Sequence, residues 1–234
     1  MTKIIVIGIG YRPFYRRESE IVLCAESILA SQRLFDIFQR YEEFGVVRDR
    51  IKVINNVNET FDFIKSRISA TSAQGNVSQN IVLLAAGDPL FFGIGKRAIE
   101  EFGKEHVEIL PDLSSIQVAF ARIKESWDGA LLISLHGGPD PEKRRKLEYA
   151  PGDVSSLVAR YAKLAILTDR ENTPKNIARE LFRSGVAGHG KSAITMYVCE
   201  KLGYPDEKIT QGNPEAISLM DFADPNVVII IAGQ

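Results

Sequence analysis

Short apolar runs, each long enough for one buried strand, recur along this chain and alternate with segments whose apolar residues follow a helical spacing. The run 3–9 is almost continuously apolar and is followed by Gly10, which is typical of a strand covered on both faces of a parallel sheet. The alternation predicts an α/β fold. We expect strands at 3–9, 51–54, 81–85, 106–110, 130–135, 164–167, 193–198 and 227–231, with helices at 19–30, 59–68, 114–123 and 174–184, one helix between the 87–89 turn and Gly103, and another that follows Asp153.

The pattern restarts near the middle of the chain. Pro111 breaks the fourth predicted strand, and residues 114–117, Ser-Ser-Ile-Gln, match a capping box that starts a new helix. A chain of 234 residues is long enough for two compact domains. We therefore expect two consecutive α/β domains, 1–112 and 113–234, with a ligand cleft between them.

Polar residues mark several of the expected boundaries. Asn58, Asp153 and Thr173 are each placed to cap a helix, and Pro174 suits the first helical turn, where its missing N–H is not needed. The polar, glycine-interrupted segment 71–79 predicts an exposed loop.

Composition excludes several classes of protein. The chain has 29 Lys and Arg against 30 Asp and Glu, so its net charge of -1 gives no general attraction for nucleic acid. No apolar run reaches the length of a membrane span, and the N-terminal run is too short and glycine-interrupted for a signal peptide. Cys24 and Cys199 lie among apolar residues, so we expect buried, reduced thiols in a cytoplasmic protein. The three histidines show no ligand spacing with them, so we expect no metal site.

Residues 185–192, GVAGHGKS, fit the phosphate-binding pattern G-x-x-x-x-G-K-[ST]. A phosphate loop follows a strand and precedes a helix, so that backbone amides and the helix N-terminus converge on the anion. Here a predicted helix comes before the segment and a predicted strand, 193–198, comes after it. We therefore interpret the match as a coincidence of a glycine-rich loop.

Three turns follow predicted strands and carry residues suited to a ligand. Gly8 and Gly10 would let a ligand approach the backbone, although a lone G-x-G is also typical of an ordinary tight turn. Residues 87–89, Gly-Asp-Pro, follow the strand at 81–85, where Asp88 could cap the next helix, accept a hydrogen bond from a ligand, or do both. The third turn, 111–115, precedes a capped helix. In open α/β sheets, ligands bind beyond the carboxyl ends of the strands.

In this order, the three turns resemble those of the tetrapyrrole methylase family of S-adenosylmethionine-dependent methyltransferases, and the resemblance covers nearly the whole chain. Two further stretches, 127–137 and 198–209, are similar to the branch that methylates C(5) of precorrin-7 or cobalt-precorrin-7 in cobalamin synthesis. The first turn departs from the family's usual G-x-G-P-G, because Tyr11 and Arg12 follow Gly10.

The resemblance implies a two-domain homodimer that binds S-adenosylmethionine and releases S-adenosylhomocysteine. The reaction would place a methyl group on a meso carbon of an acid-rich precorrin or cobalt-precorrin. A separate C(15)-methyltransferase and decarboxylase is an expected partner, because this chain has no room for a second methyltransferase domain. The residues implied to contact the cofactor are Ala86, Gly87, Asp88, Phe91, Ser114, Ser115, Leu135, His136, Gly137, Met196 and Tyr197.

Two roles follow from the chemistry of such a substrate. Arginines suit carboxylates, so Arg12, Arg16 and Arg17, with Tyr11 beside them, are predicted to contact the tetrapyrrole. Imidazole side chains titrate near neutrality in general, so His136 is the first candidate for a proton-transfer residue, although packing beside adenine is an equal alternative.

Two other functions remain open from the sequence alone. A member of the same family could act on another precorrin, on RNA or on a protein, and the near-zero net charge argues against RNA. A non-catalytic nucleotide-binding module would depend on the 185–192 match.

Overall fold

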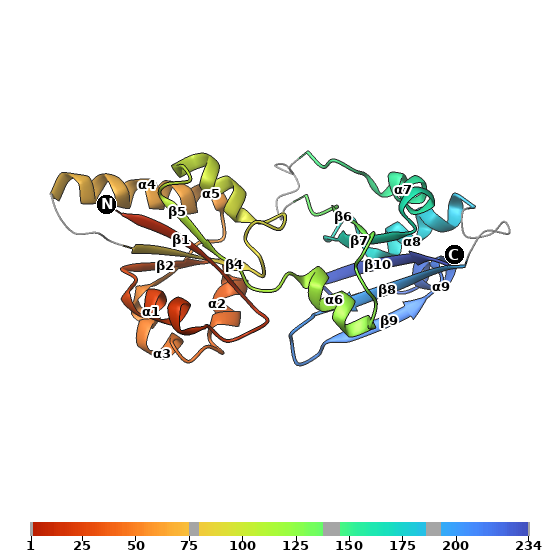
Figure 1. Cartoon of the computed structure of the whole chain (residues 1–234), viewed down its shortest axis with the longest axis horizontal. Coiled ribbons are helices and arrows are strands. Elements are labelled where there is room, and N and C mark those ends of the chain that lie inside the picture. The colour runs from red at the N-terminus through yellow and green to blue at the C-terminus, as the bar shows by residue number, and fades with distance from the viewer. Residues whose placement is uncertain (1, 75–79, 138–145, 186–192, 234) are drawn as a thin grey trace. The chain divides into compact units, whose positions relative to one another are not determined.

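The computed structural model describes residues 2–74, 80–137, 146–185 and 193–233, with only the backbone described for 71–74. The chain forms two compact units, Met1–Ser114 and Ser115–Gln234, and each contains one five-stranded sheet (Figure 1). The predicted α/β fold is confirmed. Among helices in the described ranges, none is long and apolar enough to span a membrane.

The first unit contains a fully parallel sheet in the order β3-β2-β4-β1-β5. Helices α4 and α5 cover one face, and α1, α2 and α3 cover the other (Figure 1). On the α4 face, Phe61 and Ile64 pack with the buried side chains of Ile4, Val6 and Leu83. The elements are β1 (Lys3–Ile9), α1 (Arg16–Cys24), β2 (Ser27–Ala30), α2 (Gln32–Phe38), α3 (Phe44–Val47), a 3-10 turn (Arg48–Arg50), β3 (Ile51–Val53), α4 (Val57–Gln74), β4 (Asn80–Ala86), α5 (Ile94–Phe102) and β5 (Val107–Leu110).

Several boundaries in this unit differ from the prediction. The predicted helix 19–30 is wrong, because the helix ends at Cys24 and strand β2 follows it. The apolar residues of β2 continue the apolar pattern of α1, and the two elements therefore resembled one longer helix in the sequence. Asn56 starts α4 in place of Asn58, since its side-chain oxygen accepts from the backbone N–H groups of Asn58 and Glu59. Helix α4 also continues to Gln74, into the segment that we expected to be a loop.

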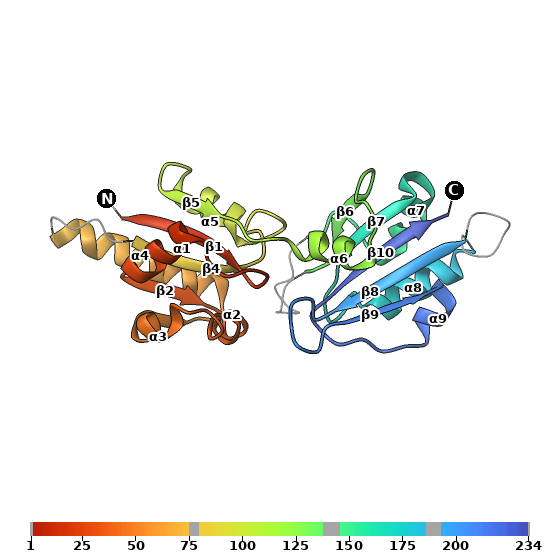
Figure 2. The same ribbon diagram turned by 60° about the horizontal axis from the view of Figure 1, so that its bottom comes forward.

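The second unit contains a mixed sheet in the order β6-β7-β10-β8-β9, in which only β6 and β7 pair in parallel. Helices α7, α8 and α9 pack on one face, where Ile177, Leu181 and Ile217 join the core, and Figure 2 shows α8 and α9 side by side. Helix α6 contacts β7 and β10. The elements are α6 (Ser115–Ile123), β6 (Leu131–Ser134), a 3-10 turn (Pro151–Asp153), α7 (Val154–Tyr161), β7 (Lys163–Leu167), α8 (Pro174–Arg183), β8 (Ile194–Glu200), β9 (Lys208–Gly212), α9 (Pro214–Ser218) and β10 (Asn226–Ala232).

Of the two capping residues predicted for helices α7 and α8, one is confirmed and the other is wrong. Thr173 caps α8 through a hydrogen bond from the Asn176 N–H, with Pro174 in the first turn, as predicted. Asp153 does not cap α7, because its carboxylate accepts from the Ala150 N–H of the preceding 3-10 turn. The GVAGHGKS segment lies outside the described residues except for Gly185.

The two cysteines lie in different environments. Cys24 is exposed, which contradicts the prediction, because it is two residues after the buried Val22 and so lies on the other side of α1. Cys199 is fully buried in β8, and burial raises the pKa of its thiol to about 12.

We expect a thiol reagent to modify one cysteine per native chain, since a buried neutral thiol is both inaccessible and unreactive. The Cys24→Ser variant should show no modification until denaturant is added. Equal reaction of both native thiols would contradict this assignment.

Because the unfolded thiol loses its proton at lower pH than the folded one, Cys199 stabilises the fold below pH 9, and this contribution is lost as pH rises toward 12. The loss should be about 1.4 kcal/mol per pH unit and absent in Cys199→Ala.

Candidate functional site

The three turns singled out in the sequence lie together at one edge of the first sheet. Strand β1 pairs in parallel with β4 on one side and with β5 on the other, so the carboxyl ends of all three strands lie side by side. The Gly87 N–H donates to the Ile9 carbonyl at 2.9 Å, and the Asp112 N–H donates to the Gly87 carbonyl at 3.3 Å. Backbone hydrogen bonds therefore join the turns that follow β1, β4 and β5.

Glycine is required at two positions in this junction because the backbones approach so closely. A Cβ atom on Gly8 would lie 1.8 Å from the Gly87 carbonyl oxygen and 2.5 Å from the Asp112 nitrogen. Gly87 has a φ of +60°, and a Cβ there would lie 2.7 Å from the Leu113 carbonyl oxygen. Any side chain at either position would have to displace a neighbouring turn.

The proposed cofactor residues of this unit lie along the same edge. Ala86 is exposed at the end of β4, Asp88 is half-buried, and Ser114 is buried in the turn after β5. One carboxylate oxygen of Asp88 accepts from the Leu90 N–H, and within the described residues its other oxygen accepts no hydrogen bond. Asp88 does not cap α5, whose N-cap is Gly93. Phe91 packs edge-on against Phe92, at 4.9 Å between ring centroids.

The loop after β1 is joined to the turn after β5 by side chains. Asp112, with a side chain only 1% exposed, accepts from the Tyr11 N–H at 2.8 Å and from the Leu113 N–H at 2.7 Å. Arg12 Nε lies 3.3 Å from Asp112 Oδ1, and Arg12 Nη2 lies 3.3 Å from Glu18 Oε1. The same Nη2 donates to the Pro111 carbonyl at 2.7 Å.

Tyr41 fixes the same loop from the side of α2. Its hydroxyl accepts from the Gly10 N–H at 2.8 Å and donates to the Arg12 carbonyl at 2.9 Å. The ring packs against Phe14 and Phe38. Burial, opposed by the hydrogen bond with Gly10, raises the pKa of Tyr41, so the hydroxyl keeps the proton that it donates.

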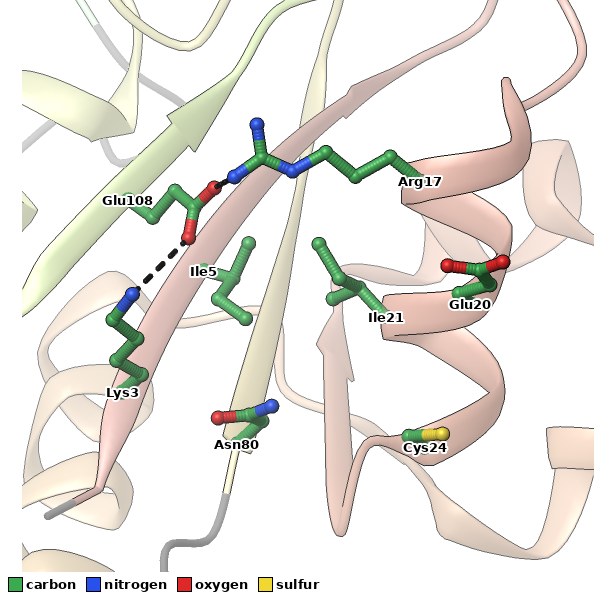
Figure 3. A pocket seen from close by; sticks show the side chains of 8 residues that line it. All are labelled: Lys3, Ile5, Arg17, Glu20, Ile21, Cys24, Asn80 and Glu108. Atoms are coloured by element: carbon green, nitrogen blue, oxygen red, sulfur yellow. Dashed lines mark hydrogen bonds and ion pairs between the residues drawn. The ribbon is translucent and has the colours of Figure 1, made fainter.

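Arg16 and Arg17 lie in the first turn of α1. Arg16 is 92% exposed and pairs with Glu20, one turn along the same helix, at 2.8 Å. Arg17 contacts Glu108, which also pairs with Lys3, across a hollow of about 330 Å³ (Figure 3). That hollow extends toward Lys3 and Asn80, the first residues of β1 and β4, and so away from the glycine turns.

Three of the predicted site residues of the second unit form the turn directly after β6. The turn of Leu135, His136 and Gly137 is fixed by the loop after β7: the Gly137 N–H donates to Asp169 at 2.8 Å, and the Asn172 side chain donates to the Leu135 carbonyl at 2.7 Å. Leu135 and Gly137 are buried, whereas His136 is exposed. This arrangement presents the His136 side chain on an anchored turn.

Met196 and Tyr197 point to opposite faces of the second sheet, as neighbours in a strand must. Met196 is fully buried and joins the core beneath α7 and α8. Tyr197 is half-buried on the other face. The two side chains therefore cannot both line a pocket on one face of this sheet.

Asp112, Tyr41, Asp169 and Asn172 were not singled out from the sequence. The only signal was that Asp112 and Asp169 each follow a predicted strand, as functional polar residues in such folds often do. Among the residues that the structure describes, no group of three His, Cys, Asp or Glu side chains could bind a metal ion.

A family model for tetrapyrrole (corrin/porphyrin) methylases matches residues 17–217, most of the chain. The chain belongs to the tetrapyrrole methylase family. This membership identifies it as a methyltransferase and agrees with the resemblance drawn from the three turns.

Several individual proteins match nearly the whole of this chain. A probable cobalt-precorrin-7 C(5)-methyltransferase from Methanocaldococcus jannaschii is 28% identical over 225 residues, which cover 95% of this chain and 94% of that protein. A precorrin-6Y C(5,15)-methyltransferase from Mycobacterium tuberculosis is 24% identical over 230 residues, and the match spans 97% of this chain but only 51% of that enzyme. A solved precorrin-6Y methylase from Archaeoglobus fulgidus shares the fold with a TM-score of 0.60 and 24% identity, over 100% of this chain and 98% of that one.

Proposed function

We propose that this chain methylates C(5) of precorrin-7 or cobalt-precorrin-7 in cobalamin synthesis, with S-adenosylmethionine as the methyl donor. The observation that carries the proposal is the junction of the turns after β4, β1 and β5, where the backbones are too close for any side chain on Gly8 or Gly87. The names of the relatives support the substrate class.

The first unit has features that fit the amino-acid and ribose portions of this cofactor. Small residues at Ala86 and Gly87 leave the backbone approachable, and the second oxygen of Asp88 can accept from an amino or hydroxyl group. Phe91 follows the Gly87 turn and Ser114 lies in the turn after β5, while Ser115 is the first residue of α6 in the second unit. When bound, S-adenosylmethionine would supply an electrophilic methyl group.

Contacts to the adenine are proposed for Leu135, His136 and Gly137 of the second unit. Hydrogen bonds with Asp169 and Asn172 hold this turn in place. A turn held in this way suits the preformed pocket that a flat aromatic ligand such as adenine occupies. Tyr197, half-buried on the other face of the sheet, is also proposed to contact the cofactor. Met196 is covered by α7 and α8 and packs in the core.

The chemistry asked of the protein is mainly alignment. A meso carbon conjugated to ring nitrogens can act as the nucleophile, so the residues need to orient it and exclude water, which can lower a barrier by roughly 7–11 kcal/mol. His136 is the proposed group for moving a proton, because it is exposed on a fixed turn.

Calorimetric titration with S-adenosylhomocysteine tests the cofactor, and mass analysis of precorrin-7 after incubation with S-adenosylmethionine tests the reaction. We expect micromolar binding and a product heavier by one methyl group. Binding to RNA at low salt, without methylation of precorrin-7, would contradict the proposed substrate.

Arg16 and Arg17 are proposed to contact substrate carboxylates from the first turn of α1. Because both are largely exposed, the Arg16→Ala, Arg17→Ala double variant should change stability by less than about 1 kcal/mol. It should raise the KM for the tetrapyrrole about tenfold, with unchanged cofactor affinity. Arg183→Ala, which removes another exposed arginine paired within its helix, is the matched control. Equal loss of both ligands would contradict this placement.

Two assembly states are also proposed: a homodimer, and association with a separate C(15)-methyltransferase. The name of the relative from Mycobacterium tuberculosis, which joins C(5) and C(15) methylation in one enzyme, supports the second. Light scattering of the chain alone and with such a partner distinguishes them.

A further inference from the structure

The loop after β1 contains an ion cluster that none of the proposed ligand contacts explains. We define the Arg12 cluster as Arg12, Glu18 and Asp112 with the Pro111 carbonyl. Its two carboxylate side chains are only 10% and 1% exposed, and the Arg12 guanidinium also stacks 4.1 Å from the centroid of the Tyr15 ring.

Arg12 is therefore directed inward. Its Nε and Nη2 groups are occupied by two carboxylates and a carbonyl of the protein. A substrate carboxylate would have to compete with two buried carboxylates, which would then lose the charge that compensates them. This geometry favours an internal role for Arg12 over the predicted contact with substrate.

Asp112 connects all three turns of the junction. Its side chain accepts from Tyr11 in the β1 loop and from Leu113 in the β5 turn, and its own N–H donates to Gly87 in the β4 turn. Only the first two bonds and the contact with Arg12 depend on the carboxylate. A change of the side chain should thus release the β1 loop while keeping the backbone bond to Gly87.

The sequence of this loop gives a reason for such a cluster. Where related methylases have G-x-G-P-G, a proline and a glycine define the turn through the backbone itself. Here Tyr11 and Arg12 follow Gly10, and the proline stands two positions later, at Pro13, where it restricts residues 12 and 13 but leaves 10 and 11 without such a restriction. Side-chain contacts from Asp112, Glu18 and Tyr41 define the path of residues 10–12 instead.

We propose that Arg12 and Asp112 are positioning residues that fix the β1 loop, residues 10–15, for the tetrapyrrole, and that Arg12 does not bind a substrate carboxylate itself. The inference rests on the proposed function, because it assigns the loop to the same substrate. It changes the expected effect of substitution: loss of Asp112, which cannot attract a substrate carboxylate, should impair the reaction as much as loss of Arg12.

The test compares Asp112→Asn, Arg12→Met and Arg12→Lys with Asp221→Asn, which removes one carboxylate of an exposed ion pair and serves as the control. We expect kcat/KM for precorrin-7 to fall at least about tenfold in Asp112→Asn and Arg12→Met, since small misplacements of reactants are costly. Arg12→Lys should give an intermediate value, because an ammonium group can pair with one carboxylate but cannot reproduce the fork. The Kd for S-adenosylhomocysteine should stay within about twofold.

Hydrogen exchange of the peptide covering residues 8–18 gives a readout independent of activity. Faster exchange in Asp112→Asn and Arg12→Met, with the fall in kcat/KM, supports the proposal. Unchanged kcat/KM overturns it, as does a higher KM with unchanged exchange, which would make Arg12 a direct ligand.

If the wild-type protein binds S-adenosylhomocysteine but does not methylate precorrin-7, the proposed substrate is wrong. Hydrogen exchange alone then tests the role of the Arg12 cluster: unchanged exchange overturns that role, and faster exchange supports it. If Asp112→Asn does not fold, the two Arg12 variants decide by the same criteria.

Discussion

Replacement of Gly8 by alanine is expected to destabilise the first unit by at least about 4 kcal/mol and to abolish binding of S-adenosylhomocysteine. The added Cβ would lie 1.8 Å from the Gly87 carbonyl oxygen and 2.5 Å from the Asp112 nitrogen. Both neighbours are backbone atoms, so no side-chain rotation can relieve the overlap. The turns after β4 and β5 would have to move apart, and these turns contain the proposed cofactor contacts.

Thermal unfolding and calorimetric titration measure the two parts of this prediction. The melting temperature should fall by roughly 10 °C, given the size of the chain. Gly45→Ala is the matched control: Gly45 is exposed in α3, and a Cβ there would meet nothing within 4 Å. That variant should change stability by less than about 1 kcal/mol and leave binding intact. A Gly8→Ala protein with wild-type stability and affinity would show that the junction is looser than we describe.

Replacement of Asp169 by alanine is expected to have the largest effect in the second unit, a loss of about 3 kcal/mol. The buried carboxylate accepts from the backbone N–H groups of Gly137, Glu171 and Asn172. Its removal leaves the buried Gly137 N–H without this acceptor, and of the two side-chain anchors between the β6 turn and the β7 loop only the Asn172 hydrogen bond to Leu135 is left. If the β6 turn binds adenine, affinity for S-adenosylhomocysteine should fall at least about tenfold.

Two comparisons sharpen the Asp169 experiment. Asp153→Ala removes an exposed carboxylate that accepts from one backbone N–H, at Ala150, and should cost less than about 1 kcal/mol. Asn172→Ala removes the second anchor of the β6 turn, the hydrogen bond to the Leu135 carbonyl. Should both Asp169→Ala and Asn172→Ala lose stability but keep wild-type affinity, the β6 turn would not belong to the cofactor site.

The short and exposed elements show where local pattern fails. Strand β2 contributes four residues and is separated from the end of α1 by only two residues, and an apolar run of that length fits either a helix or a strand. Strand β9 is an edge strand with mostly exposed residues, so no apolar alternation marked it. The expected caps at Asn58 and Asp153 failed because each turn had another nearby donor or acceptor to use.

The sequence by itself determined the elements whose burial is nearly complete, such as β1, β4 and β10, and the glycine and Gly-Asp-Pro turns that follow two of them. It could do so because these signals are local: an apolar run, a glycine, a capping residue. Only the tertiary structure decided which distant groups meet. Asp112 reaches Tyr11 across 101 residues, and Asp169 reaches Gly137 across 32. Parallel pairing places strand ends side by side regardless of their separation in sequence, so the partners of a buried charge are set by strand order.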